Sequence, residues 1–462
     1  MDLKVLLKET ACLGPSEQSK KKTIQLSGLD RMSPANLYTV FFYKSSDALD
    51  SKTSSSSSKA EDVVERAKRA LQKVLVAWYP AAGRFRINKE TGKLEIDCND
   101  KGVTVVTAMT NSKLEELGGE LHQYKLCYEK LVPQLPVADN VSDNPLLVVQ
   151  ITKFACGGVS IGLGGGHALF DGVGAFNFLA SWAHICSGKD ENDLLLPNHS
   201  REALLNAIDD SPKSGPTSSS ISSSAANSIY EQEHIVAIQD LYGIPMQVVA
   251  SDDRCWESAL AIRLGGNDDS SQAAGLQHVT LSMKKEVVEE WKRLVVQRGK
   301  LSKCSTFDFL CAHLWKILEA GFNPHLVPTS GNAFVLGSVS CRASDVMEEP
   351  LHITIGRIQA AKELITGEYI RLFAKALESP DKFFPSMREL TIVTDWLKFG
   401  FHALDFGWGK VSSLALLASP VPEAAFLMVS LEEPGGFVVR IGVDDNHVSD
   451  FIDSFTNFDY PL

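Results

Sequence analysis

The residues best suited to chemistry lie in one short run, which reads GGGHALFDG at positions 164–172. His167 carries an imidazole, whose ordinary pKa of about 6.5 lets it take a proton from a hydroxyl or an amine near neutral pH. Asp171 follows four residues later and can hold the local turn in shape. The glycines have no side chain to keep a second molecule away from the backbone. We therefore take His167 as a candidate general base.

Two predicted elements position this histidine. An apolar run at 159–163 is typical of a strand, and apolar or small residues recur over 175–186 at the spacing of a buried helix face. His167 is thus predicted to lie in a strand-to-helix turn. The competing interpretation is a structural histidine of the core. A metal site is disfavoured, because no third ligand clusters near His167 and Asp171.

A second motif, DFGWG, follows at 405–409. The ordered pair of HxxxDG and DFGWG resembles the plant BAHD acyltransferases, which transfer acyl groups from coenzyme A thioesters. Three further segments resemble the same family in the same order, so that the resemblance covers essentially the whole chain: WYPAAGR at 78–84, STF at 305–307 and TDW at 394–396. The extended first motif, HALFDGVGAFNF, is most similar to members that move hydroxycinnamoyl groups onto long-chain alcohols or hydroxy fatty acids.

The resemblance implies a fold and a role for each motif residue. The fold is α/β, with two chloramphenicol acetyltransferase-like domains, a long crossover loop and an active-site channel between the domains. His167 is the general base that lets the acceptor attack the thioester directly, without an acyl-enzyme, whereas Asp171 is structural and pairs with Arg342. The other matched residues are implied to support the site (Gly172, Asp405, Gly407, Trp408 and Gly409), to contact coenzyme A (Ser305 and Thr306) or to line the acceptor pocket (Thr394 and Trp396).

One segment departs from the family pattern. After Cys341 and Arg342 the family shows a YFGN-like run, whereas this chain has TIGR at 354–357. This difference predicts a local change in the shape of the pocket.

Two other motif interpretations do not fit their context. DFG alone is also found in kinases, but the chain has neither a GxGxxG loop nor an HRD catalytic loop. GVSIG at 158–162 matches the nucleophile elbow of serine hydrolases, but an elbow needs its serine at a strand-to-helix turn. Ser160 lies inside the predicted strand, so we do not favour a hydrolase.

Composition and length limit the remaining classes. The chain has 462 residues and a net charge of −12, which argues against a sequence-independent grip on nucleic acid. Its nine cysteines are scattered without a CxxC pair, so that neither a disulfide framework nor a structural zinc site is predicted. A charged residue interrupts the apolar N-terminus, and no stretch reaches the roughly 18 apolar residues of a membrane span. These features predict a soluble cytoplasmic protein.

The order of the predicted elements suggests two domains. A serine-rich stretch follows the helix after His167, and we place the crossover linker at 188–228, between domains at 1–187 and 229–462. Beyond the elements named above, we predict strands at 37–43, 95–97, 103–107, 146–154, 333–339, 425–431 and 437–443, and helices at 61–76, 284–297 and 305–320.

We therefore predict a monomeric, metal-free O-acyltransferase of plant specialised metabolism. It would use acyl-CoA as co-substrate, hold no permanent cofactor, and transfer an aromatic, hydroxycinnamoyl-type acyl group to a hydroxyl of a metabolite or long-chain alcohol. Two alternatives stay open at this point. The same base can serve an amine such as a polyamine, and some relatives act as non-catalytic partners of fatty acyl elongation.

Overall fold

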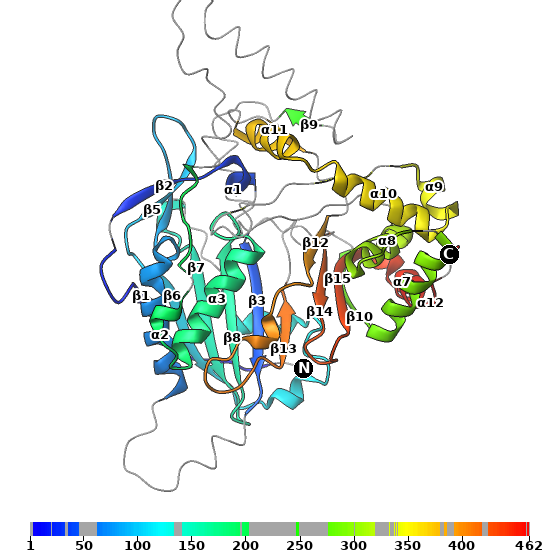
Figure 1. The fold of residues 1–462 in the computed structure, drawn as a ribbon. Coiled ribbons are helices and arrows are strands. Elements are labelled where there is room, and N and C mark those ends of the chain that lie inside the picture. Colours follow the sequence, from blue (N-terminus) through cyan, green and yellow to red (C-terminus); the bar gives the residue numbers. More distant parts are fainter. Residues whose placement is uncertain are drawn as a thin grey trace, which may run out of the picture.

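The computed structural model describes most of the chain in two lobes that lie side by side (Figure 1). The first half of the sequence forms one lobe around a six-stranded sheet, and a four-stranded sheet with its helices forms the other. The described residues are 3–19, 21–32, 36–45, 62–133, 141–194, 196–202, 246–248, 276–299, 301–318, 332, 337, 339, 341–378, 383–385, 392–417, 424–458 and 460–461. In this part of the chain, no helix is both long and apolar enough to cross a membrane.

The six-stranded sheet positions the candidate histidine. Its pairs are antiparallel except for β6 and β7, which run parallel, and α2 (Val63–Ala77) and α3 (Gly172–Cys186) cover one face in Figure 1. The strands follow the order β1 (Leu6–Leu13), β6 (Val103–Met109), β7 (Leu147–Lys153), β8 (Val159–Gly166), β3 (Asn36–Tyr43) and β13 (Ser413–Leu416).

The four-stranded sheet has two apolar faces, because the side chains of a strand alternate between the faces. On one face, residues such as Leu427 and Val439 pack against helices of the second lobe, whereas Phe426 and Val438 belong to the core shared with the first lobe. The strands follow the order β10 (Leu276–Met283), β15 (Phe437–Asp444), β14 (Ala425–Val429) and β12 (Val393–Trp396). The helices are α7 (Lys285–Gly299), α8 (Thr306–Leu318), α10 (Leu351–Glu363) and α12 (Val448–Asn457).

Smaller elements complete the two lobes. A three-stranded sheet has the order β2 (Lys22–Gln25), β5 (Leu94–Cys98) and β4 (Arg84–Ile87), and β9 (Met246–Val248) pairs with β11 (Phe383–Pro385). The remaining helices are α1 (Gly28–Met32), α9 (Ala343–Glu348), α11 (Gly367–Glu378) and the short 3₁₀ helices η1 (Tyr79–Ala82), η2 (Leu114–Leu117), η3 (Leu126–Leu131), η4 (Val141–Asp143), η5 (Glu191–Asp193), η7 (Phe401–Ala403) and η8 (Asp445–His447).

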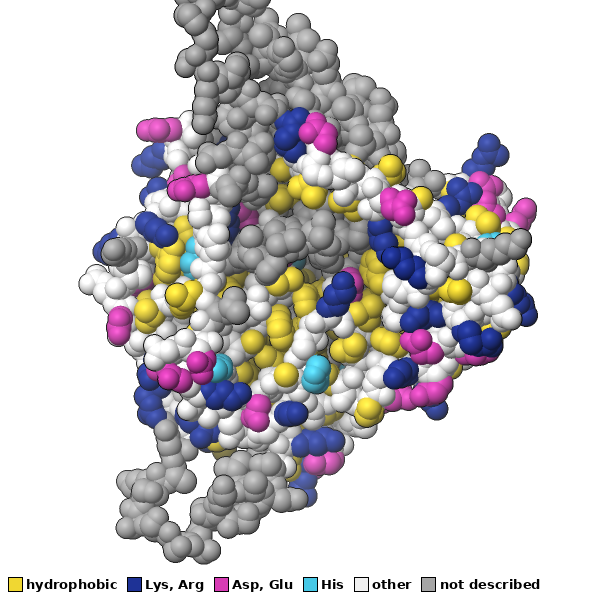
Figure 2. Space-filling view, in the orientation of Figure 1, with side chains coloured by type: hydrophobic (Ala, Val, Ile, Leu, Met, Phe, Trp, Pro, Cys, Tyr) yellow, Lys and Arg dark blue, Asp and Glu magenta, His cyan; other side chains and the backbone are white. Residues whose placement is uncertain are grey.

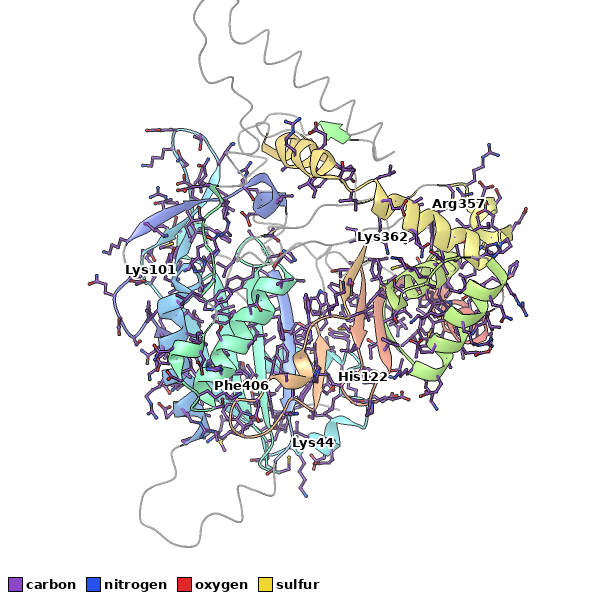
Figure 3. The ribbon with its side chains drawn as sticks, in the orientation of Figure 1. Lys44, Lys101, His122, Arg357, Lys362 and Phe406 are labelled. Carbon is purple, nitrogen blue, oxygen red and sulfur yellow. The ribbon has the colours of Figure 1, made fainter. Side chains whose placement is uncertain are left out.

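The two halves of the chain interleave. β13 comes from the second half but is hydrogen-bonded to β3 at the edge of the first sheet. His122 also joins the lobes: its Nδ1 lies 2.8 Å from Glu432 Oε2, and its Nε2 lies 3.1 Å from Ser282 Oγ (Figure 3). The domains at 1–187 and 229–462 and the linker at 188–228 therefore stay a prediction. The structure adds that one strand of the second half, β13, belongs to the sheet of the first lobe.

The predicted elements compare well with the observed ones. The strand pair at 146–154 and 159–163 is confirmed as β7 and β8, and the helix at 175–186 is confirmed within α3. The serine-rich stretch at 218–224 and most of the predicted strand at 333–339 lie outside the described residues. The predicted α/β architecture with two sheets in two lobes is confirmed.

A neutral histidine is buried in the core of the second lobe, and we expect it to make stability depend on pH. His313 is fully buried, and burial lowers its pKa to about 3. Its Nε2 donates to the Phe455 carbonyl at 3.1 Å, so Nδ1 accepts from the Tyr460 hydroxyl at 2.6 Å. Between about pH 6.5 and about pH 3, His313 is protonated in the unfolded state but stays neutral in the folded state. Stability therefore falls as pH decreases through this window, by up to about 1.4 kcal/mol per pH unit.

The His313→Leu variant checks this expectation. Urea unfolding is measured at several pH values between about 6 and about 4.5, which lie below the reference histidine pKa of about 6.5. These measurements give the slope of the unfolding free energy against pH. We expect a shallower slope in the variant than in the wild-type protein. Equal slopes would mean that His313 does not contribute.

Candidate active site

His167 lies in the predicted turn. β8 ends at Gly166, residues 167–169 form a turn in which Leu169 N donates to Gly166 O at 2.9 Å, and α3 begins at Gly172. His167 is partly exposed, whereas Ala168 and Leu169 after it are buried. A partly exposed histidine at a strand end can meet a small molecule, unlike the fully buried His313.

Asp171 caps the helix that follows the histidine. Its side chain is 5% exposed, and its Oδ1 accepts a hydrogen bond from Gly174 N at 2.8 Å. This is the N-cap bond that satisfies an otherwise unpaired amide of the first turn. Arg342 is exposed at the N-cap of α9, so that its pairing with Asp171 stays a prediction.

Two substitutions separate the capping role of Asp171 from its charge. Asp171→Ala removes the cap, and we expect a loss of about 1 kcal/mol in unfolding free energy. Asp171→Asn keeps an equally good cap, so stability should stay near the wild-type value while any ion pair is lost. If the charge supports the turn, as predicted, Asp171→Asn will lower turnover without lowering stability. Unchanged turnover in that variant would remove the ion pair from the account.

The predicted acceptor-pocket segment packs directly against the start of α3. A Cβ atom placed on Gly172 would lie 2.8 Å from Phe399 Cζ and 3.4 Å from Trp396 Nε1, so the aromatic rings leave room for glycine alone. Trp396 also contacts Phe426, with ring centroids 5.4 Å apart. The structure therefore brings together Gly172 and Trp396 beside the turn that carries His167.

A row of side chains runs from this point across the second sheet. The register places Thr394 opposite Phe426, Phe426 opposite Arg440, and Arg440 opposite Thr280. At the usual strand spacing, Thr394 and Arg440 are about 10 Å apart. Arg440 is buried, its Nη2 donates to Leu417 O at 2.6 Å, and burial lowers its pKa to about 10. It stays charged near neutral pH and adds a positive charge to this row.

The DFGWG segment forms a tight turn held by its own aspartate. Asp405 Oδ1 accepts from Gly407 N at 2.7 Å and from Gly409 N at 3.2 Å. Both glycines have positive φ, at 86° and 116°, a conformation that side chains disfavour. The pattern of aspartate and glycines therefore specifies the turn itself.

The aromatic residues of this turn fasten it to the first lobe. Phe406 is fully buried, with its ring centroid 4.9 Å from that of Trp182 and 5.8 Å from that of Tyr43 (Figure 3). The Arg66 guanidinium lies 5.8 Å from the Trp408 ring. Trp182 lies ten residues into α3, or about 15 Å along the helix from Gly172. This segment thus packs well away from His167.

Ser305 and Thr306 open α8. Ser305 Oγ accepts from Asp308 N at 3.0 Å, and Asp308 Oδ2 accepts from Ser305 N at 3.1 Å, which makes a capping box. Lys292 Nζ lies 3.4 Å from Thr306 Oγ1, so that a cation stands beside the helix start. An open groove of about 530 Å³ adjoins it, lined by Glu289, Lys292, Arg293, Val296, Gln297 and Cys304.

The segment at 354–357 that departs from the family pattern lies within α10. Thr354 and Ile355 are buried against the core, whereas Arg357 points outward and pairs with Glu349 at 2.5 Å (Figure 3). Its predicted effect on pocket shape stays a prediction.

Sequence reasoning missed a polar cluster that touches the His167 backbone. Asn332 Nδ2 donates to the His167 carbonyl at 2.7 Å, and buried Asp30 binds both Asn332 and Arg201. The serine at 27 followed by Asp30 is a helix-start signal, but nothing in the sequence relates Asp30 to residues 171 and 302 positions away.

Among the described residues, Ser160 and the cysteines do not form a second centre. Ser160 is fully buried near the start of β8, where it is paired with Phe42 on one side and Thr152 on the other, so it is not at a strand-to-helix elbow. All eight described cysteines are free, and no three histidine, cysteine or acidic side chains of the described residues form a metal-binding group.

Hydrophobic side chains gather between the two sheets on the face shown in Figure 2.

The fold and this site define a two-domain α/β acyltransferase. The sequence profile described as the Transferase family matches residues 3–323 and 322–457, and the chain belongs to this family, the BAHD acyltransferases. The Brassinosteroid-related acyltransferase 1 of Arabidopsis thaliana is 33% identical, with 94% of each chain covered. The Omega-hydroxypalmitate O-feruloyl transferase of the same plant is 28% identical, covering 98% of this chain and 93% of the relative.

Solved structures share the fold at low sequence identity. Vinorine synthase superposes with a TM-score of 0.66 at 20% identity, covering 98% of this chain and 96% of that one. TRI101 of F. graminearum, complexed with coenzyme A and deoxynivalenol, superposes with a TM-score of 0.62 at 16% identity, covering 93% and 96%. These likenesses support the two-domain architecture.

Proposed function

We propose that this protein transfers an acyl group from acyl-CoA to a hydroxyl, with His167 as the general base. The observation that carries the proposal is the position of His167, partly exposed in the turn between β8 and α3, whose first residue, Gly172, packs against Trp396 and Phe399. An alcohol is too weak an acid to react unaided at neutral pH, and a positioned base typically contributes about 10²- to 10⁴-fold.

The reaction balances without a covalent enzyme intermediate. His167 takes the hydroxyl proton as the acceptor oxygen attacks the thioester carbonyl. The C–O bond forms, the C–S bond breaks, and the thiolate of coenzyme A takes up the proton. The products are one ester and one free coenzyme A. No metal or permanent cofactor takes part in this scheme.

For the donor we propose a hydroxycinnamoyl-type acyl group. The support is the extended HALFDGVGAFNF motif together with relatives whose names state feruloyl, caffeoyl and hydroxycinnamoyl transfer. We place the coenzyme A moiety beside Ser305 and Thr306, where Lys292 offers a positive charge to a phosphate. The acyl end would then reach His167 from the second lobe.

For the acceptor we propose a long-chain alcohol or hydroxy fatty acid that lies along Thr394 and Trp396. A steroid alcohol is the second candidate, because a relative that is 33% identical is named for brassinosteroids. An amine acceptor uses the same base and is an arm of the test below. A non-catalytic role in acyl elongation would leave His167 without a function in turnover.

We also propose that the protein acts as a cytoplasmic monomer in plant specialised metabolism. Both substrates are small molecules. The proposed reaction therefore requires neither a nucleic acid nor a second protein.

A panel assay tests the proposed function. Purified protein is incubated with coumaroyl-, caffeoyl-, feruloyl-, benzoyl- or acetyl-CoA, and with long-chain alcohols, steroid alcohols, shikimate-type acids or polyamines. We expect release of coenzyme A with a hydroxycinnamoyl donor and an alcohol. Release only with polyamines would favour amide formation, and release with no pair would favour the elongation partner.

A further inference from the structure

A fully buried carboxylate organises the polar cluster behind His167. Asp30 of α1 has no exposed surface, and its Oδ2 accepts from Ser27 N at 3.0 Å, Ser27 Oγ at 2.8 Å and Arg201 Nε at 3.2 Å. Its Oδ1 accepts from Asn332 N at 2.8 Å and from Asn332 Nδ2 at 3.2 Å. A buried charge is costly unless it is paired and hydrogen-bonded, so Asp30 fixes Arg201 and Asn332 firmly.

Asn332 links the buried Asp30 to the backbone of His167. The side chain is 3% exposed, and its Nδ2 donates both to Asp30 Oδ1 and to the His167 carbonyl, at 3.2 and 2.7 Å. A carboxylate and a carbonyl can only accept, so the amide nitrogen must face both of them. The peptide group that follows His167 is thereby held by a residue 165 positions away.

We propose that Asp30, Arg201 and Asn332 form a positioning clamp for the general base. The clamp joins three distant segments: α1, the chain after the first lobe, and residue 332 of the second half. α11 of the second half of the chain packs beside α1, which carries Asp30 (Figure 1). Asn332 does not touch reacting atoms. It acts by fixing the backbone from which the imidazole projects.

The expected effect follows from the geometry of general base catalysis. A misplacement of about 1 Å at the reacting centre can cost about 10²-fold in rate. We therefore expect Asn332→Ala to lower kcat by about 10²-fold while the KM for acyl-CoA stays unchanged. Asn332→Ser retains one hydroxyl donor and should recover part of the loss. It also serves in place of the alanine variant if that variant does not fold.

Gln150→Ala is the matched control. Gln150 is also a buried amide, and its Nε2 donates to the Lys130 carbonyl at 2.8 Å and to Thr152 Oγ1 at 3.0 Å. It lies opposite Gly162, or about 13 Å along β8 from the end of that strand at Gly166. The Gln150→Ala variant also loses a hydrogen bond from a buried amide to a backbone carbonyl. Its stability should therefore fall, while its kcat stays near the wild-type value. In a His167→Ala background, Asn332→Ala should cause no further loss, because the two residues act as one unit.

The kinetic arm rests on the proposed function, so a second readout is independent of substrate. Hydrogen exchange of the amides at 167–174 should be faster in Asn332→Ala than in Gln150→Ala, relative to the wild-type protein. Equal exchange and equal kcat in the two variants would overturn the clamp. If the wild-type protein shows no acyl transfer, the proposed function fails, and the exchange rates alone decide whether the clamp exists.

Discussion

We expect the His167→Ala variant to lose acyl transfer almost completely, with kcat lower by about 10²- to 10⁴-fold. The reason is that the alanine side chain has no base that could take the proton of the attacking hydroxyl. Binding of acyl-CoA should change little, because the imidazole acts on the acceptor. Steady-state kinetics with the best donor and acceptor pair measure both quantities.

His184→Ala is the matched control for this result. His184 lies on the same helix, α3, near its C-terminal end, and its Nε2 is 2.7 Å from the Asp190 carbonyl. We expect kcat near the wild-type value in this variant. Full activity in His167→Ala, with the fold intact by circular dichroism, would remove His167 from the mechanism.

The second large effect concerns Gly162, in the middle of the strand that delivers His167. A Cβ atom at this position would lie only 2.0 Å from the backbone oxygen of Leu131 and 2.9 Å from Val132 Cβ. No flexible side chain can yield there, because the obstacle is the backbone of η3. We expect Gly162→Ala to lower the unfolding free energy by about 3 kcal/mol or more, as severe overpacking does. Urea unfolding measures the change.

Gly356→Ala is the control, because it makes the same change where there is space. Gly356 is in the interior of α10, and, apart from the backbone of its own helix and its two neighbours in the chain, no atom of the described residues lies within 4 Å of a Cβ placed on it. Alanine is the better helix former by up to about 1 kcal/mol, so this variant should be stabilised. A Gly162→Ala protein as stable as the wild type would show that η3 can move away from β8.

Local pattern was enough to predict the turn that carries His167. The strand and the helix around it follow from their hydrophobic periods, and the glycines and Asp171 mark the turn between them. DFGWG likewise specifies its own turn, because Asp405 binds amides only two and four residues away. Interactions this short in sequence can be read from residue order alone.

Contacts between distant segments could not be read in this way. The bond between Asn332 and His167 spans 165 residues, and Asp30 reaches Asn332 across 302 residues. Neither has a periodic pattern, and each depends on how the two lobes meet. The pairing of β13 with β3 was missed for the same reason, because an edge strand of four residues carries little signal of its partner. The position of Arg342 also depends on tertiary structure.

The most direct test of acyl transfer is the stoichiometry of the products. The wild-type protein is mixed with feruloyl-CoA and a long-chain alcohol, and free coenzyme A and ester are quantified together over time by mass spectrometry. The account predicts that the two products appear in equal amounts. Coenzyme A released without ester would mean thioester hydrolysis and would contradict the proposed transfer.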